Sequence, residues 1–396
     1  MTAPTATSAD PATAPMPHPG RHAARSPART ALRRLAAALG WAVAVAGPGV
    51  AETIPTTAGP VRVDAVVQGL DTPWAIGLLP GGGLLVTERE GDLIHVADGR
   101  SQRVSGTPQV WANGQGGLLD VTVARDFAQS REIFLTYAKP QGGGAGTALA
   151  VARLSTDGTR LENLREIFEM TPGGSTTRHF GSRVVEAGDG TLFLTIGDRG
   201  DAQKAQDLGA HNGSVVRINR DGTVPGDNPF AGQPGARPEI WSYGHRNAQG
   251  AALDLEGRLW TAEHGARGGD EVNRIEKGAN YGWPVISYGV NYNGSAIGEG
   301  TQRAGMEQPE FYWDPSIAPS GLLVYSGRLW PEWRGDLFVG SLKFDHIARL
   351  EGRPLAEGER IEGESTGRVR DIAEGPDGAI WFLSVFDGAV YRMVPG

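Results

Sequence analysis

The sequence predicts an all-β protein, a six-bladed β-propeller built of four-stranded antiparallel blades. Glycine accounts for 59 of the 396 residues, and 26 prolines add further breaks, as expected of many short strands joined by tight turns. Strong helix signals are scarce. One pattern, an apolar strand, a turn containing Gly or Asp and a second apolar strand, recurs six times. A repeat of this kind is typical of a propeller.

The repeat can be followed through most of the chain. Its first strands read WAIGLL, LLDVTV, SRVVEA, GAALDL, GLLVYS and VRDIAE, and its second strands read LLVT, IFLTY, LFLT, RLWTA, DLFVG and AIWFL. Asp-Gly and Gly-Gly turns between apolar runs are strong hairpin signals. Each copy averages roughly 57 residues, more than the usual length of a blade, so we expect long loops at 139–147, 199–240 and 263–317. The segment VRVDAVVQGL is expected to join the last strands. The alternatives are a β-sandwich and a β-helix.

The N-terminus has the pattern of an export signal. Arg33 and Arg34 precede the apolar stretch LAAALGWAVAVAGPGVA, which ends in small residues, as signal peptides do. We expect residues 1–51 to be a signal peptide with a long polar leader, cleaved near Ala51, and residues 52–396 to be the propeller. The protein would then be periplasmic or secreted. A membrane anchor is the alternative, but this stretch is short for a membrane span.

Charge and cysteine content exclude several classes of function. The formal net charge is −8, which disfavours a nucleic-acid partner. The chain has no cysteine, so disulfides, thiolate catalysis and cysteine-ligated metal sites are excluded. No coiled coil or long apolar face predicts a strong interface, so we expect a monomer or a weak homodimer without stable membrane insertion.

A histidine and an aspartate flank the third hairpin. His179 lies in HFGSR before the hairpin, and Asp198 lies in TIGDRGD after it. Since a hairpin brings its two ends together, the two side chains can be neighbours. A carboxylate that accepts the imidazole N–H fixes the tautomer and raises the basicity of the ring. The pair therefore predicts an oriented general base. The plainer interpretation is a structural histidine beside a turn-forming aspartate.

Other polar groups lie near the ends of the hairpins. Arg246 and Asn247 in YGHRNAQG can donate to carbonyls or carboxylates. Gln115 in GQGGLLD stands beside glycines that permit a close approach of the backbone. Glu271, with backbone carbonyls of the Gly-rich segment 262–284, can hold Ca²⁺, which prefers oxygen ligands. Taken singly, each of these residues also fits an ordinary surface loop.

Three cations belong to the last two hairpins. Lys343 lies in SLKFDHIAR, and Arg368 and Arg370 lie in TGRVRDIAEG. If they meet at one mouth of the channel, they suit a polyanionic ligand in a protein that is otherwise acidic. Taken singly, each is more simply a surface charge.

Together, these motifs resemble those of a known family. They occur in one order along the chain: GLDTPWAIGLLPGG, GQGGLLDV, HFGSR, TIGDRGD, YGHRNAQG, EHGARGGDEVN, GANYGWP, SLKFDHI and GRVRDI. The chain is similar to the soluble aldose sugar dehydrogenases that depend on pyrroloquinoline quinone (PQQ). This family includes soluble quinoprotein glucose dehydrogenase and sorbosone dehydrogenase-like proteins. The resemblance covers residues of roughly 60 to 395.

The resemblance implies a role for each polar residue around the predicted base. His179 matches the general base that takes the proton from the anomeric hydroxyl, and Asp198 matches the aspartate that orients it. Arg246 and Asn247 match the pair that faces the quinone carbonyls, and Arg246 also stabilises the developing oxyanion. Gln115 matches a glutamine that lines the site.

The resemblance also implies residues for the cofactor carboxylates and for calcium. The cations around the PQQ carboxylates and ring correspond to Lys343, Arg368 and Arg370. One Ca²⁺ lies against PQQ in the family, held partly by main-chain carbonyls that match Gly265 and Ala266. A second, structural Ca²⁺ uses a carboxylate and a carbonyl that match Glu271 and Tyr281.

The implied reaction is the oxidation of an aldose at C1 to an aldonolactone. In the family, hydride passes from C1 to C5 of calcium-bound PQQ, and an external electron acceptor reoxidises the cofactor. Two alternatives belong to other functional classes. One is a non-catalytic propeller that binds a glycan or a protein partner. The other is a metal-dependent lactonase, whose chemistry needs carboxylates around one central divalent ion.

Overall fold

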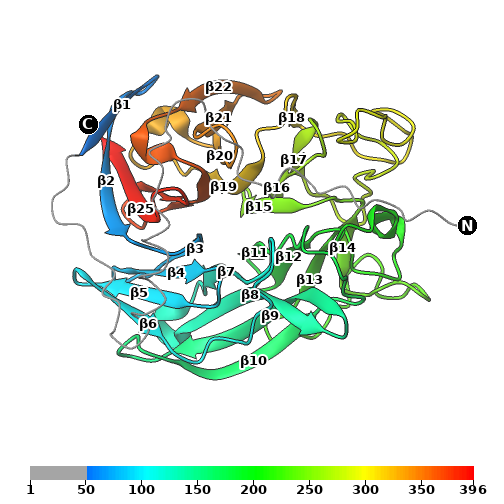
Figure 1. Cartoon of the computed structure of the whole chain (residues 1–396), viewed down its shortest axis with the longest axis horizontal. Coiled ribbons are helices and arrows are strands. Elements are labelled where there is room, and N and C mark those ends of the chain that lie inside the picture. Colours follow the sequence, from blue (N-terminus) through cyan, green and yellow to red (C-terminus); the bar gives the residue numbers. More distant parts are fainter. Residues whose placement is uncertain (1–50) are drawn as a thin grey trace, which may run out of the picture.

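The computed structural model describes residues 51–396, which form six antiparallel sheets arranged in a ring (Figure 1). Five sheets have four strands and one has five. This arrangement confirms the predicted six-bladed propeller. The predicted signal segment falls almost wholly on residues 1–50, outside the described residues. Within residues 51–396, no helix is long and apolar enough to cross a bilayer.

Five of the blades are built from strands that follow one another in the chain, and we number them in that order. Blade 1 contains β3 (Pro73–Leu78), β4 (Leu84–Glu88), β5 (Leu93–Ala97) and β6 (Arg100–Val104). Blade 2 contains β7 (Leu118–Val123), β8 (Glu132–Gln141), β9 (Gly144–Leu154) and β10 (Leu161–Glu169). Blade 3 contains β11 (Val184–Glu186), β12 (Leu192–Ile196), β13 (Ser214–Ile218) and β14 (Ile240–Tyr243).

The next two blades repeat this order. Blade 4 contains β15 (Ala248–Leu253), β16 (Leu259–Glu263), β17 (Asp270–Arg274) and β18 (Phe311–Trp313). Blade 5 contains β19 (Pro319–Val324), β20 (Leu337–Ser341), β21 (Ile347–Glu351) and β22 (Ala356–Ile361). The described helices are all short, namely α2 (Phe127–Ser130), η2 (Ala202–Gln206), η3 (Pro331–Trp333) and η4 (Glu364–Thr366).

Blade 6 joins the start of the described chain to its end and so closes the ring. It contains β23 (Val369–Glu374), β24 (Ile380–Ser384) and β25 (Ala389–Pro395), followed by β2 (Gly59–Gln68) and β1 (Glu52–Thr56). β2 pairs antiparallel with β25, with Val63 opposite Met393, and in Figure 1 the two strands lie side by side. The predicted closure by VRVDAVVQGL is therefore confirmed, and β1 adds a fifth strand that the sequence reading did not expect.

The six predicted hairpins are the first two strands of each blade. The first strands contact their counterparts in the adjacent blades: β3 meets β7 and β23, β11 meets β7 and β15, and β19 meets β15 and β23. They therefore surround the axis of the ring. Residues just before a first strand and just after a second strand come to the same end of the channel, as hairpin geometry requires.

A threonine repeated in the second strands ties neighbouring blades together. Thr87 in LLVT accepts a hydrogen bond from the Ala75 amide of its own blade at 3.0 Å and donates to the Leu119 carbonyl of blade 2 at 2.5 Å. Thr136 donates in the same way to the Ser182 carbonyl just before β11, and Thr195 donates to the Ala248 carbonyl at the start of β15. A buried hydroxyl thus satisfies polar groups between sheets, where none should be left unpaired.

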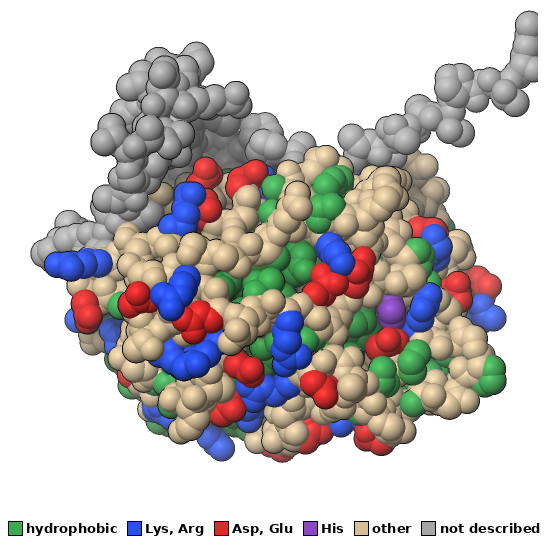
Figure 2. Space-filling model, turned by 90° about the horizontal axis from the view of Figure 1, so that it is seen from below, with side chains coloured by type: hydrophobic (Ala, Val, Ile, Leu, Met, Phe, Trp, Pro, Cys, Tyr) green, Lys and Arg blue, Asp and Glu red, His purple; other side chains and the backbone are tan. Residues whose placement is uncertain are grey.

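The hydrophobic core is divided among the interfaces between blades. The described residues form six buried apolar clusters, and each cluster draws its side chains from two adjacent blades. The outer rim, by contrast, is charged. Figure 2 shows acidic and basic side chains interspersed over the face seen from the β6 and β10 side. Some of these charges pair, as Arg220 does with Asp126 and Glu132.

The prediction of a long loop at 139–147 was wrong. β8 and β9 run through most of it and leave only a two-residue turn between Gln141 and Gly144. The glycines suggested a loop, but Gly144 serves another purpose. A Cβ at this position would lie 2.1 Å from the Gly174 carbonyl oxygen, so glycine permits the segment that leads to His179 to pack against the strand.

Candidate active site

The predicted base lies in the loop before β11, at one mouth of the channel. His179 is 4% exposed, and its backbone is in the left-handed region with a φ of 59°. Its Nδ1 lies 2.7 Å from Oδ1 of Asp198. Gly197 makes this approach possible, because a Cβ there would lie 2.1 Å from the His179 carbonyl oxygen. Since Nδ1 is engaged by the carboxylate, a base acting on a substrate would use Nε2.

Asp198 follows β12 and is held by several donors. The Gly200 amide donates to its Oδ1 at 2.6 Å, and the Trp283 indole donates to its Oδ2 at 2.9 Å. Burial alone would raise the pKa of Asp198, but His179 and Arg246 hold this pKa below its usual value. The carboxylate is therefore ionised at neutral pH, and its negative charge favours positive charge that develops on a neighbouring group.

Gln115 fixes the main chain of the base. Its Oε1 accepts from the His179 backbone amide at 2.7 Å, and the Gln115 backbone N–H donates to the Thr177 carbonyl at 2.8 Å. The sequence prediction placed Gln115 at the site. The structure brings it there, with its side chain bound to the backbone of the predicted base.

Arg246 and Asn247 stand directly before β15, beside the His179 loop. The Arg246 carbonyl accepts from the Asp198 amide at 2.9 Å, and its guanidinium donates to the Gly265 carbonyl at 2.5 Å. Asn247 accepts at Oδ1 from the Gly181 amide at 3.1 Å. Both side chains are at least nine-tenths buried, so their orientation is set by the fold.

Two of the predicted cations lie close together. Arg370 donates to Oε1 of Gln249 at 2.8 Å, and Arg368 donates to the Leu342 carbonyl at 2.9 Å. Burial, together with the neighbouring positive charges, lowers the pKa of Arg370 to about 9 and also lowers the pKa of Arg368. Lys343 directly follows Leu342, the residue whose carbonyl accepts from Arg368.

None of these three cations forms a side-chain salt bridge within residues 51–396, although Asp345 accepts from the Arg368 amide at 2.8 Å and its charge partly offsets that of Arg368. Lys343 donates to the Ser316 carbonyl at 3.2 Å. A cluster of cations without salt-bridge partners, in a protein of net charge −8, suits an anionic ligand. The predicted grouping of Lys343, Arg368 and Arg370 is therefore consistent with the structure.

The sequence profile of the family described as Glucose / Sorbosone dehydrogenase matches residues 70–392. The chain belongs to this family. It is 45% identical over 333 residues to the aldose sugar dehydrogenase YliI of Escherichia coli (strain K12), covering 82% of this chain and 90% of that one. It is 27% identical over 402 residues to quinoprotein glucose dehydrogenase B of Acinetobacter calcoaceticus, covering 80% and 84%.

Solved structures agree with this assignment to the glucose/sorbosone dehydrogenase family. The apo-form of the soluble aldose sugar dehydrogenase from Escherichia coli superposes with a TM-score of 0.81 at 43% identity, over 85% of this chain and 100% of that one. The PQQ-bound form of aldose sugar dehydrogenase from Streptomyces coelicolor gives a TM-score of 0.70 at 26% identity, over 84% and 98%. The family is thus established by sequence and by fold.

The residues predicted to hold calcium are brought together in part. Gly265, Glu271 and Tyr281 line one small cavity of about 10 Å³, which is room for a single water or ion. Ala266 follows Gly265 but is not among the residues lining that cavity. Within residues 51–396, no three acidic or histidine side chains converge as a metal site would need. A cation in this family member would therefore depend largely on carbonyl oxygens.

The charge of this cavity suits a cation. Burial and the neighbouring Glu263 raise the pKa of Glu271 to about 8, because two carboxylates here have too little positive charge nearby. Gly265 also has to be glycine, since a Cβ there would lie 2.3 Å from the carbonyl oxygens of Gly268 and Gly269. The donor set, carboxylate and carbonyl oxygen, is the one that Ca²⁺ prefers.

Three residues of the site were missed by the sequence analysis. Trp283 binds Asp198, and Gln249 binds Arg370. Arg89, just after β4, donates to the Gly114 carbonyl at 3.0 Å, and its charge adds to those that lower the pKa values of Arg368 and Arg370. The signal for Arg89 was its place in the repeat, because Asp198 and Lys343 also follow second strands.

A further histidine of the site is held neutral. Burial, Arg246 and Arg370 lower the pKa of His264 to about 3. Its Nε2 lies 2.6 Å from the Pro319 carbonyl oxygen. A neutral ring that donates from Nε2 keeps Nδ1 as an acceptor. His264 therefore differs from His179, whose Nδ1 lies against a carboxylate.

Proposed function

We propose that the protein is a PQQ- and Ca²⁺-dependent aldose dehydrogenase that converts aldoses to aldonolactones. The observation that carries this proposal is the buried His179–Asp198 pair at 2.7 Å, set beside Arg246 and Asn247. A base oriented by a carboxylate suits removal of a proton from a sugar hydroxyl. The family relatives named as aldose sugar and glucose dehydrogenases support the same substrate class.

The donors at the mouth fit PQQ, which carries carboxylates and quinone carbonyls. Arg370, Arg368 and Lys343 would hold the carboxylates, since within residues 51–396 none of these three side chains makes a salt bridge. Arg246 and the Nδ2 group of Asn247 would donate to the carbonyls. When bound, PQQ supplies the quinone that accepts two electrons from the sugar.

The residues of this chain would handle the proton and the charge. Nε2 of His179 takes the proton from the C1 hydroxyl as the C1–H bond is broken, and the ring becomes cationic. Asp198 stabilises that cation and keeps the ring in its tautomer. Arg246 faces the developing negative charge. The sugar loses two electrons and two protons, and an external acceptor of electrons completes the cycle.

One Ca²⁺ would be held partly by the main-chain carbonyls of Gly265 and Ala266, where it would act as a Lewis acid that supplements Arg246. A second, structural Ca²⁺ would be held by the Glu271 carboxylate and the Tyr281 carbonyl. We also propose export to the periplasm or beyond, on the basis of the signal pattern in residues 1–51. A monomer or weak homodimer is retained as the proposed state.

A reconstitution experiment tests the function. Protein freed of cofactor is supplied with PQQ and Ca²⁺, separately and together, and reduction of a dye by a panel of aldoses is followed. We expect turnover only with both additions. His179→Ala should lose about 10²- to 10⁴-fold in kcat while it retains PQQ binding.

The control is His95→Ala, which alters a histidine on the third strand of blade 1, and it should keep full activity. If the wild type binds PQQ but oxidises no aldose, the proposed reaction is wrong. If His179→Ala turns over as the wild type does, His179 is not the base. If the wild type binds no PQQ, the proposed cofactor is wrong.

A further inference from the structure

Gln249 connects two groups that would face the cofactor, Asn247 and Arg370. It is the second residue of β15 and is 6% exposed. Its Oε1 accepts from Arg370 Nη2 at 2.8 Å, and its Nε2 donates to Asn247 Oδ1 at 3.1 Å. The same Nε2 lies 3.1 Å from the Gly181 carbonyl oxygen, in the loop that carries His179.

The orientation of this amide is fixed by its partners. A guanidinium only donates, and a carbonyl only accepts. If the Gln249 amide were turned over, its NH₂ group would meet Arg370 and its oxygen would meet two other oxygens. Only the observed orientation satisfies all three contacts.

The orientation is passed on to Asn247. Its Oδ1 accepts both from Gln249 Nε2 and from the Gly181 amide, each at 3.1 Å. Within residues 51–396, no hydrogen bond uses Nδ2 of Asn247. Asn247 therefore presents a donor, the group that a quinone carbonyl needs, and Gln249 is what turns the acceptor end away.

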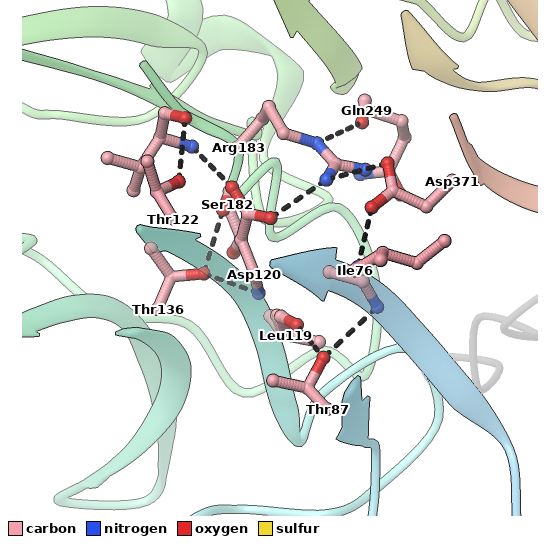
Figure 3. Close-up of polar contacts among 12 residues, drawn as sticks. Ile76, Thr87, Leu119, Asp120, Thr122, Thr136, Ser182, Arg183, Gln249 and Asp371 are labelled. Carbon is pink, nitrogen blue, oxygen red and sulfur yellow. Dashed lines mark hydrogen bonds and ion pairs between the residues drawn. The ribbon is translucent and has the colours of Figure 1, made fainter. Parts of the chain in front are cut away.

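The main chain of Gln249 is held as firmly as its side chain. Its carbonyl oxygen accepts from Arg183 Nε at 3.2 Å. Arg183 in turn pairs with Asp120 at 2.8 Å and with Asp371 at 3.0 Å. Figure 3 shows these contacts converging from several first strands. Gln249 is thus itself anchored to the buried ion-pair network of Arg183, Asp120 and Asp371. We call this network the floor of the channel.

We propose that Gln249 is a positioning residue that aims the Asn247 amide and the Arg370 guanidinium at the bound cofactor. This inference rests on the proposed function, since it takes PQQ as the ligand. Gln249 would act only through its two neighbours. Its loss leaves both donors without the partner that sets their direction, so affinity for an anionic, carbonyl-bearing ligand falls.

Two variants test this role in the whole protein freed of cofactor. Gln249→Glu keeps the size of the side chain but neutralises Arg370 and removes the donor to Asn247. Gln249→Leu removes the polar contacts altogether. PQQ is titrated in the presence of Ca²⁺, and binding is followed by tryptophan fluorescence. We expect the Kd for PQQ to rise at least about tenfold in each variant, as the loss of hydrogen bonds to a charged group implies.

Asn228→Leu is a matched control. Asn228 is a buried amide, 5% exposed, that accepts from the Arg217 guanidinium at 3.4 Å and donates to the carbonyls of Arg217 and Pro238. Its chemistry resembles that of Gln249, but these hydrogen-bond partners are not residues of the site. It should lose comparable stability and keep the wild-type Kd for PQQ.

The outcomes separate this inference from the proposed function. If the wild type binds PQQ and the Gln249 variants bind it equally well, Gln249 has no positioning role. If Asn228→Leu weakens binding as much as the Gln249 variants do, the effect is only loss of stability, and the inference again fails. If the wild type binds no PQQ, the proposed function fails and this inference fails with it. Should Gln249→Leu not fold, Gln249→Glu alone decides.

Discussion

Two arginines pack against the same tryptophan and have opposite surroundings. The guanidinium carbons of Arg183 and Arg370 lie 4.7 and 4.4 Å from the centre of the Trp74 ring. Burial alone would lower the pKa of Arg183, but its ion pairs with Asp120 and Asp371 raise it. Arg370 has no such pair within residues 51–396, and its pKa falls to about 9.

The difference separates structural charge from charge kept for a ligand. Arg183 is neutralised inside the fold and holds first strands of the propeller together (Figure 3). An unneutralised cation away from water is unfavourable, so Arg370 destabilises the protein unless something negative binds to it. Sites of this kind exchange stability for function. The floor of the channel and its mouth should therefore respond in opposite ways to the loss of an arginine.

The largest effect is expected at the floor. Arg183→Met leaves Asp120 and Asp371 buried without their counter-ion, and breaking a buried pair in this way costs about 3–5 kcal/mol. The free energy of unfolding of the cofactor-free protein, measured in guanidinium chloride, should fall by this amount. A loss below about 1 kcal/mol, which is ordinary for any substitution, would mean that this ion-pair network does not stabilise the ring.

The next effect is expected at the mouth and concerns binding. Arg370→Met removes a buried cation that makes no salt bridge within residues 51–396, so the cofactor-free protein should be as stable as the wild type or more stable. Affinity for PQQ should fall about ten- to a hundredfold, as expected for a charged hydrogen bond. Thermal unfolding without PQQ measures the stability of the variant. Thermal unfolding with PQQ measures its affinity, because a ligand that binds the folded state raises Tm.

The result for Arg370→Met can also contradict the contrast between a structural Arg183 and a ligand-binding Arg370. If the variant loses as much stability without cofactor as Arg183→Met does, then both arginines are structural. If its Tm rises with PQQ as far as that of the wild type, Arg370 does not hold the cofactor.

The fold was readable from the sequence because a propeller repeats. Six similar hairpins predicted six blades, and the repeated threonine of the second strands joins three pairs of blades as a physical unit. His179 and Asp198 were also predictable, since they flank one hairpin and local geometry alone brings them together.

The rest of the site depends on contacts between blades, which no local pattern reveals. Trp283 is 85 residues from Asp198, and Gln249 is 121 residues from Arg370. Gln249 stood in the motif YGHRNAQG, but its partner was in another blade. A usable signal existed: Trp74, Gln249 and Arg370 are each the second residue of a first strand, at the same level of the channel.

The smallest expected effect concerns two carboxylates that repeat the contrast between mouth and floor. The pKa of Asp198 lies below its usual value, whereas burial raises that of Asp120. Asp198 therefore contributes stability above the usual aspartate pKa of about 3.9, and this stability is lost as pH falls through its lower folded value. In Asp198→Asn, the fall of unfolding free energy below about pH 4 should be shallower, by at most about 1.4 kcal/mol per pH unit.

Urea unfolding between about pH 2.5 and 7, a range chosen to bracket the carboxylate pKa values, measures this slope. Asp98→Asn is the control, since Asp98 is an exposed turn residue whose φ of 49° suits asparagine equally well, and its slope should match the wild type. The raised pKa of Asp120 has the opposite effect on the pH dependence of stability. The stability that comes from a raised pKa is lost as pH increases. An unchanged slope in Asp198→Asn would show that Asp198 titrates alike in the folded and unfolded chains, and the mouth would then lack the preorganised carboxylate that a base at His179 requires.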